Sequence, residues 1–186
     1  MNLGLLLIDI QNDYFPNGKF ELYRAEEAAN QAKKILQSFR EHGLPVFHVR
    51  HINQSPAAAF FVRDTEGVQI HKSVCPQDSE TVIEKHTPDS FYQTNLKSEL
   101  DKKDIRHLVV CGMMTHMCVD TTVRAARSLG YDITLIEDAC ATRDLEWNNA
   151  VVPAPVVQAA FMASLSGSFA EITTADKWKI CGKTDK

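Results

Sequence analysis

Short runs of apolar residues alternate along the chain with segments in which apolar residues recur every three or four positions. The runs predict buried strands and the segments predict helices. The runs lie at residues 3–8, 44–49, 81–84, 106–112, 132–136 and 168–172. The helix-like segments lie at residues 25–42, 96–103, 118–129 and 155–165. This alternation predicts one domain over residues 1–186, a Rossmann-like three-layer α/β/α fold with a mainly parallel sheet.

Two regions refine this prediction. Residues 3–8 are almost wholly apolar, as expected for a strand that is buried on both faces of a parallel sheet. Residues 50–76 have no clear periodicity and form a long connection, which in a compact domain is usually functional. We expect this loop to cover a pocket or to contact another subunit. Its adjacent Phe60 and Phe61 are predicted to form an exposed contact.

Reactive side chains fall where the predicted strands end. In parallel sheets, ligands bind beyond the carboxyl ends of the strands. Asp9 follows the first strand, Lys85 follows the third, and Cys118 begins the helix after the fourth. A helix N-terminus and a nearby ammonium would stabilise the thiolate of Cys118. Each residue also has an ordinary alternative: a turn residue for Asp9, a solvated lysine for Lys85 and a core residue for Cys118.

Composition excludes several classes of protein. The chain has 186 residues, 20 basic and 24 acidic side chains, and a formal net charge of −4, with no basic run, so neither nucleic acid nor a membrane is expected as a partner. The N-terminal apolar run is too short for a signal peptide or a membrane span. The 5 cysteines are odd in number and contain no CxxC pair. We therefore expect a reduced, cytoplasmic protein.

Five short motifs occur in order, each weak alone but specific together, at residues 6–15, 83–91, 111–119, 138–144 and 169–172. With these motifs the chain resembles the isochorismatase-like cysteine hydrolase superfamily over nearly its whole length. The resemblance implies about six parallel strands with flanking helices. It also implies a catalytic triad, in which Asp9 is the base, Lys85 supports the pair electrostatically and Cys118 is the nucleophile.

The same resemblance implies further features of the site. The backbone amides of Met114 and Cys118 would form an oxyanion hole, and a cis peptide bond would join Met113 to Met114. Family members are commonly homodimers or homotetramers that act on small molecules. Neighbours of the triad motifs in sequence are the candidate substrate contacts, and they are Gln11, Phe15, Phe91, Met113 and Trp147.

Two absences narrow the expected activity. Isochorismatases cleave a vinyl ether and generally lack the cysteine, so Cys118 favours the amide-cleaving branch and a thioester acyl-enzyme. Nicotinamidases have a zinc site with an Asp-x-His motif, whereas this chain has Asp64-Thr65-Glu66. We therefore expect no metal and no cofactor.

Several alternatives stay open. His116 or His86 could activate Cys118 in place of Asp9. Cys118 could be a redox-sensing thiol in a binding protein without catalytic activity, and an ether-cleaving isochorismatase is a third possibility. Among amide-like substrates, ureido compounds, carbamoyl amines, biuret-like molecules and aromatic amides are all compatible with the sequence.

Overall fold

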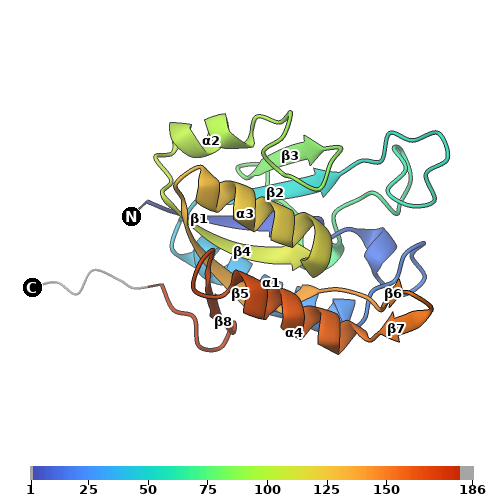
Figure 1. The fold of residues 1–186 in the computed structure, drawn as a ribbon. Helices are drawn as coiled ribbons and strands as arrows, with labels where there is room; N and C mark the ends of the chain where they lie inside the picture. The colour runs from blue at the N-terminus through green and yellow to red at the C-terminus, as the bar shows by residue number, and fades with distance from the viewer. Residues whose placement is uncertain (1, 181–186) are drawn as a thin grey trace, which may run out of the picture.

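The computed structural model describes residues 2–180 and contains the parallel sheet that the alternating pattern predicts (Figure 1). Six strands lie in the order β3-β2-β1-β4-β5-β8, and every neighbouring pair is parallel. Their bounds are β1 Leu3–Ile8, β2 Val46–His51, β3 Thr81–Lys85, β4 His107–Met113, β5 Asp132–Ala141 and β8 Glu171–Thr173. The predicted fold class is therefore confirmed.

Helices cover both faces of this sheet. α1 (Ala25–Glu41) packs on one face, against side chains such as Leu5 and Leu7 of β1. α2 (Leu96–Lys102), α3 (Asp120–Ser128) and α4 (Ala154–Leu165) pack on the other face, together with Leu6 and Ile8. Because successive side chains of a strand point to opposite faces, the fully apolar run 3–8 supplies both cores.

The strand order reverses between β1 and β4. From β1 the chain winds outward through β2 to β3, then crosses back to β4 and continues through β5 to β8. In open parallel sheets a ligand site usually lies at such a switch point, beyond the carboxyl ends of the strands. Residues that follow β1 and β4 therefore occupy the favoured position for a site.

The structure changes several predicted boundaries. β5 continues to Ala141, and the last strand is the short β8 instead of residues 168–172. The helix predicted from Cys118 begins only at Asp120, because a π-helical turn at Thr115–Val119 precedes it. The hydrophobic pattern also did not predict the hairpin formed by β6 (Leu145–Trp147) and β7 (Ala150–Val152).

The long connection after β2 is better packed than predicted. It contains a 3-10 turn at Lys72–Val74, and its Ile70 forms a β-bridge with Gln11. Phe61 is 1% exposed, and Phe60 is partly buried and stacks on Phe20 with ring centroids 4.4 Å apart. The prediction of an exposed aromatic pair is therefore wrong, because both rings pack against the core next to Tyr14.

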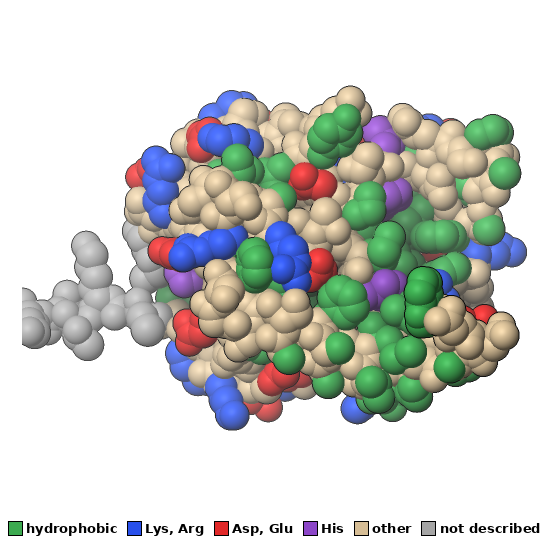
Figure 2. Space-filling model, in the orientation of Figure 1, with side chains coloured by type: hydrophobic (Ala, Val, Ile, Leu, Met, Phe, Trp, Pro, Cys, Tyr) green, Lys and Arg blue, Asp and Glu red, His purple; other side chains and the backbone are tan. Residues whose placement is uncertain are grey.

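Exposed hydrophobic side chains gather over α4 and the β6–β7 hairpin (Figure 2). Trp147 is 74% exposed, Val151 59% and Val156 55%.

Among residues 2–180, no helix combines the length and the apolar character needed to cross a lipid bilayer.

Candidate active site

The three residues of the predicted triad meet at the carboxyl edge of the sheet. Lys85 is the last residue of β3, Asp9 directly follows β1, and Cys118 lies in the π-helical turn after β4. Asp9 and Lys85 are 0% exposed and Cys118 is 5% exposed. Parallel strands bring these distant residues together because their carboxyl ends share one edge.

Lys85 Nζ is the centre of the group. It lies 2.7 Å from Asp9 Oδ2 and donates a hydrogen bond of 3.1 Å to Cys118 Sγ. It donates another of 3.0 Å to the carbonyl oxygen of Thr87. Burial lowers the pKa of Lys85, but the charges of Asp9 and Cys118 outweigh this effect and raise it overall. Lys85 is therefore a charged ammonium in a buried place.

The second carboxylate oxygen of Asp9 does not contact Lys85 in this way. Asp9 Oδ1 is buried and has no hydrogen-bond partner among residues 2–180. A carboxylate oxygen of Asp9 and the sulfur of Cys118 lie within 4.8 Å of each other. The backbone of Asp9 has a φ of 52°, in the left-handed region that is uncommon for residues other than glycine. A buried carboxylate with an unused acceptor next to a thiol has the position required of a general base.

The turn around Cys118 is closed by backbone hydrogen bonds. The carbonyl of Met114 accepts hydrogen bonds from the amides of Met117 and Val119. The peptide bond between Met113 and Met114 is cis, as the resemblance implied. The preceding Gly112 has a φ of +148°, and a Cβ there would lie 2.2 Å from the Ile8 carbonyl oxygen, so only glycine fits.

The expected low pKa of Cys118 is wrong. Burial is the largest influence and raises the pKa of the thiol, and the negative charge of Asp9 raises it further. Lys85 opposes both effects without overcoming them. The prediction included the helix dipole and the ammonium, but it omitted the desolvation of a thiolate. Cys118 therefore rests as a thiol and needs a base to ionise it.

His51 belongs to the same group, although it was not among the site residues predicted from the sequence. It ends β2 and is the register partner of Lys85 on β3. Its Nδ1 lies 2.9 Å from Lys85 Nζ. The predicted strand ended at Val49, two residues too early. Extension of that strand by two residues, into the polar segment that follows, would have placed His51 at the carboxyl edge.

These residues do not fit a metal ion. Ligand atoms of Asp9, His51 and Cys118 lie within 4.8 Å of one another, an arrangement that alone could hold a cation. Lys85 Nζ, however, lies 2.7 Å from Asp9, 2.9 Å from His51 and 3.1 Å from Cys118. The ammonium thus occupies the space and supplies the positive charge that a metal would bring.

The five predicted substrate contacts do not lie together. Gln11 and Met113 are fully buried, and the side-chain amide of Gln11 is bonded to the backbone of His51 and Val68. Phe91 stacks on Tyr131. Tyr131 directly precedes β5, so this contact lies at the amino ends of the strands, away from the triad. Phe15 stacks on His71 with ring centroids 3.7 Å apart. Trp147 is exposed on the β6–β7 hairpin.

Tyr14 is a side chain that sequence reasoning did not select. It is 1% exposed, and burial raises the pKa of its phenol, with further increases from the charges of Cys118 and Asp9. Its ring lies 4.6 Å from that of Phe61, which in turn lies 5.9 Å from the ring of His51. Its position within the first motif was the only sequence signal.

The histidines considered as alternative bases point elsewhere. His86 Nδ1 lies 2.9 Å from the carbonyl oxygen of Ile52, and His116 Nδ1 lies 2.6 Å from Thr142 Oγ1. Lys85 forms a side-chain hydrogen bond with Cys118, and among residues 2–180 neither histidine does. The observed contacts favour Asp9 over either histidine.

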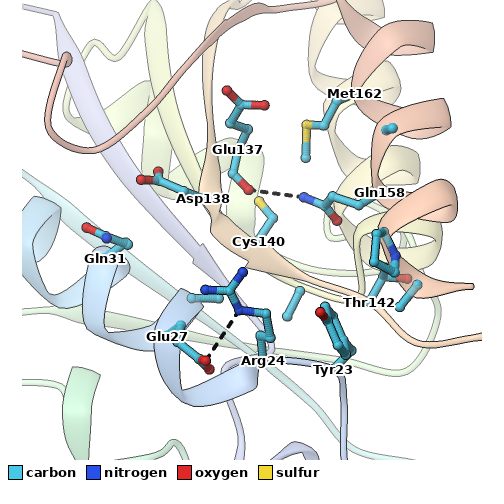
Figure 3. A pocket seen from close by; sticks show the side chains of 15 residues that line it. Tyr23, Arg24, Glu27, Gln31, Glu137, Asp138, Cys140, Thr142, Gln158 and Met162 are labelled. Carbon is cyan, nitrogen blue, oxygen red and sulfur yellow. Dashed lines mark hydrogen bonds and ion pairs between the residues drawn. The ribbon is translucent and has the colours of Figure 1, made fainter.

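A pocket of about 470 Å³ lies apart from the triad, between α1, the end of β5 and α4 (Figure 3). Cys140 is among its lining residues, with Glu137 and Gln158. Cys140 is another buried cysteine near a strand end that could be considered as a nucleophile. Burial raises its pKa to about 12, and no ammonium contacts it among the described residues.

Known proteins share both this sequence and this fold. A family model described as the isochorismatase domain matches residues 4–177. An uncharacterized isochorismatase family protein, YddQ of Bacillus subtilis, is 52% identical over 176 residues, covering 95% of this chain and 98% of that protein. An isochorismatase from Pseudomonas putida has a crystal structure with a TM-score of 0.90 and 34% identity, covering 96% of this chain and 90% of that one.

Two further relatives have named activities. Streptothricin hydrolase of Streptomyces noursei is 31% identical over 177 residues, covering 95% of this chain and 61% of that protein. The N-carbamoylsarcosine amidase of Thermoplasma acidophilum has a structure with a TM-score of 0.80 and 26% identity, covering 98% of this chain and all 100% of that one. The extent of the family match and these relatives show that the chain belongs to the isochorismatase family of hydrolases.

Proposed function

We propose that the chain is a cysteine-dependent hydrolase that cleaves a small amide, ureido or carbamoyl compound through a thioester on Cys118. One observation carries this proposal: Lys85 Nζ lies 2.7 Å from Asp9 and 3.1 Å from Cys118 in a buried group. That arrangement supplies a base, a nucleophile and a fixed positive charge. The amidase and the hydrolase among the relatives support this choice of reaction.

The first half-reaction forms the thioester. Asp9 accepts the thiol proton as Sγ of Cys118 attacks the carbonyl carbon of the substrate. The carbonyl oxygen gains negative charge, which the amides of Met114 and Cys118 stabilise by hydrogen bonding. The carbon–nitrogen bond then breaks, and the proton held by Asp9 passes to the departing nitrogen. An amine or ammonia leaves, and the acyl group remains on sulfur.

The second half-reaction returns the enzyme to its resting state. Asp9, again a carboxylate, accepts a proton from water as the water oxygen attacks the thioester carbonyl. The carbon–sulfur bond breaks, and the thiolate of Cys118 takes the proton back from Asp9. Because burial raises the pKa of the thiol, both halves need Asp9 as a proton carrier. Lys85 keeps its charge throughout and stabilises each transient anion.

The sensor alternative has less support. A redox-sensing cysteine is usually accessible and has a low pKa. Cys118 is 5% exposed, and burial raises its pKa. These properties instead suit a nucleophile that ionises only when a substrate is bound.

A substrate screen tests the proposal. Small amides, ureides, carbamoyl amines and one vinyl ether are incubated with the wild type, Cys118→Ala and Asp9→Asn, and the release of ammonia, amine or enol product is measured. We expect carbon–nitrogen cleavage by the wild type and none by Cys118→Ala. Asp9→Asn should lose about 10²- to 10⁴-fold, the usual contribution of general base catalysis. Cys140→Ala is the matched control, since it removes another buried thiol, and it should keep full activity.

Two results would contradict the proposal. Turnover of a carbon–nitrogen substrate by Cys118→Ala would exclude the covalent route. Cleavage of the vinyl ether alone, with no amide or ureide accepted, would favour an isochorismatase-type reaction.

A further inference from the structure

The ammonium of Lys85 has one more potential partner than it has protons. Its neighbours are Asp9 Oδ2 at 2.7 Å, His51 Nδ1 at 2.9 Å, the Thr87 carbonyl oxygen at 3.0 Å and Cys118 Sγ at 3.1 Å. An ammonium donates three hydrogen bonds and accepts none. When Cys118 is a thiol, its sulfur is only a weak acceptor, so Asp9, His51 and Thr87 match the three protons. When Cys118 is a thiolate, one of these partners must give up its hydrogen bond, so that a proton of Lys85 can point to the sulfur.

His51 has the protonation state needed to accept one of these hydrogen bonds. Burial is the main cause that lowers its pKa to about 4, and the charge of Lys85 lowers it further. His51 is therefore a neutral imidazole at neutral pH. Its Nδ1 can accept from Lys85 only if the ring proton is on Nε2.

From these contacts we propose that His51 is a positioning residue for Lys85 in the hydrolysis proposed above, and this inference rests on that function. His51 Nδ1 and the Thr87 carbonyl oxygen hold two protons of the ammonium on neutral acceptors. The third proton then lies between Asp9 and Cys118, the two groups that exchange a proton during catalysis. As Asp9 takes the thiol proton it becomes a weaker acceptor, and the third proton of Lys85 turns to the new thiolate. No bond to carbon is involved, and Lys85 stays charged.

The backbone around His51 is fixed in a way that supports this role. Gln11 Oε1 accepts a hydrogen bond of 2.7 Å from the His51 amide, and Gln11 Nε2 donates one of 2.9 Å to the His51 carbonyl oxygen. Gln11 Nε2 also donates to the Val68 carbonyl oxygen at 2.8 Å. The residue predicted as a substrate contact thus clamps the His51 peptide, and its amide has no donor or acceptor atom left unbonded.

Three substitutions separate the acceptor from the bulk of the ring. His51→Leu removes the acceptor. His51→Asn keeps an oxygen about as far from Cβ as Nδ1 is, and His51→Gln moves the same amide one bond further out. For a substrate found in the screen, His51→Leu should lower kcat roughly 10- to 100-fold, the scale of a small misplacement of a catalytic group. KM should stay nearly constant, since His51 acts through Lys85.

The rescue pattern is the decisive readout. His51→Asn should restore kcat to within about threefold of the wild type, whereas His51→Gln should behave like His51→Leu. This expectation follows because only asparagine returns an acceptor to the Nδ1 position. A kcat of His51→Leu within twofold of the wild type would overturn the proposal, as would equal rates for the asparagine and glutamine variants.

A second measurement needs no substrate. Nitrogen-15 NMR of the wild type should show His51 as the Nε2–H tautomer and neutral down to about pH 4, the value to which its pKa is lowered. The Lys85→Met variant lacks the ammonium, so the pKa of His51 should rise. The ring proton of His51 should then no longer be confined to Nε2. An unchanged His51 titration in Lys85→Met would overturn the contact. If Cys118→Ala retains turnover while these NMR results hold, the proposed function fails and the Lys85–His51 contact does not.

Discussion

The Lys85 ammonium lies 2.7 Å from the Asp9 carboxylate, and neither side chain is exposed to solvent. Water does little to stabilise either charge there, so each charge is stabilised mainly by the other and by its remaining hydrogen-bond partners. This mutual dependence makes the pair both the electrostatic centre of the site and a point where the fold is sensitive to substitution.

Removal of one partner should therefore destabilise the protein more than removal of both. Lys85→Met leaves the Asp9 charge buried without its ion partner and should cost about 3–5 kcal/mol of unfolding free energy. Asp9→Asn/Lys85→Met should recover a substantial part of that loss, because no unpaired charge remains. Urea unfolding of the wild type and the single and double variants measures this. Additive losses would show that the two side chains are not coupled.

Activity should not depend on a metal ion, because Lys85 Nζ lies between the only described side chains that could form such a site. Dialysis against a strong chelator should leave kcat unchanged for any substrate found in the screen. Loss of activity that zinc restores would refute this prediction. The Cys118→Ala variant, treated in the same way, controls for background hydrolysis.

Stability should fall as the pH is lowered from about 7 to 4. His51 has a pKa of about 4 in the folded protein, below its ordinary value of 6.5, so the unfolded chain binds the extra proton first. The free energy of unfolding should drop by roughly 2–3 kcal/mol through this residue, using about 1.4 kcal/mol per pKa unit. Below pH 4.5 a further loss should follow, because Arg40 and His48 help to hold the pKa of Glu80 at about 2.

Unfolding midpoints measured at pH 7, 5.5 and 4.5 test this dependence. His51→Asn cannot gain the proton, so its stability should fall less over the same interval. Equal slopes for the variant and the wild type would contradict the assignment.

The predicted homo-oligomer has a candidate interface on the apolar face over α4 and the β6–β7 hairpin. Val151 and Val156 are 59% and 55% exposed there. We expect Val151→Lys/Val156→Glu to shift the sedimentation coefficient toward that of a monomer, because charges would be desolvated in the contact. Val82→Lys is the matched control, since Val82 is 42% exposed on the edge strand β3. A wild-type monomer, or an unchanged double variant, would contradict this expectation.

Hydrophobic periodicity was enough to predict the sheet and its main helices. The run 3–8 is apolar at every position because it faces two cores, as a central strand of a parallel sheet does when helices cover both of its faces. The hairpin at residues 145–152 was not predicted because its strands are only three residues long, too short to show an alternating pattern. Its turn lies at Asn148 and Asn149. Both asparagines have positive φ, as the common tight hairpin turns require.

The candidate site was predicted unevenly for a physical reason. Asp9, Lys85 and Cys118 could be selected because strand ends in a parallel sheet converge. His51 was missed because the strand boundary was placed two residues too early, and the Thr87 contact involves a backbone carbonyl, which sequence does not distinguish. The direction of the Cys118 pKa shift depends on burial, which spacing along a chain does not measure.

The most direct test of covalent catalysis by Cys118 is the mass of the enzyme during turnover. A substrate from the screen is mixed with the enzyme, the reaction is quenched in acid within one turnover, and intact mass spectrometry is followed by peptide mapping. We expect an added mass equal to the acyl group on the peptide that contains Cys118. The adduct should be absent in Cys118→Ala and present in Cys140→Ala. An acyl group on Cys140, or continued turnover by Cys118→Ala without any adduct, would contradict the proposed mechanism.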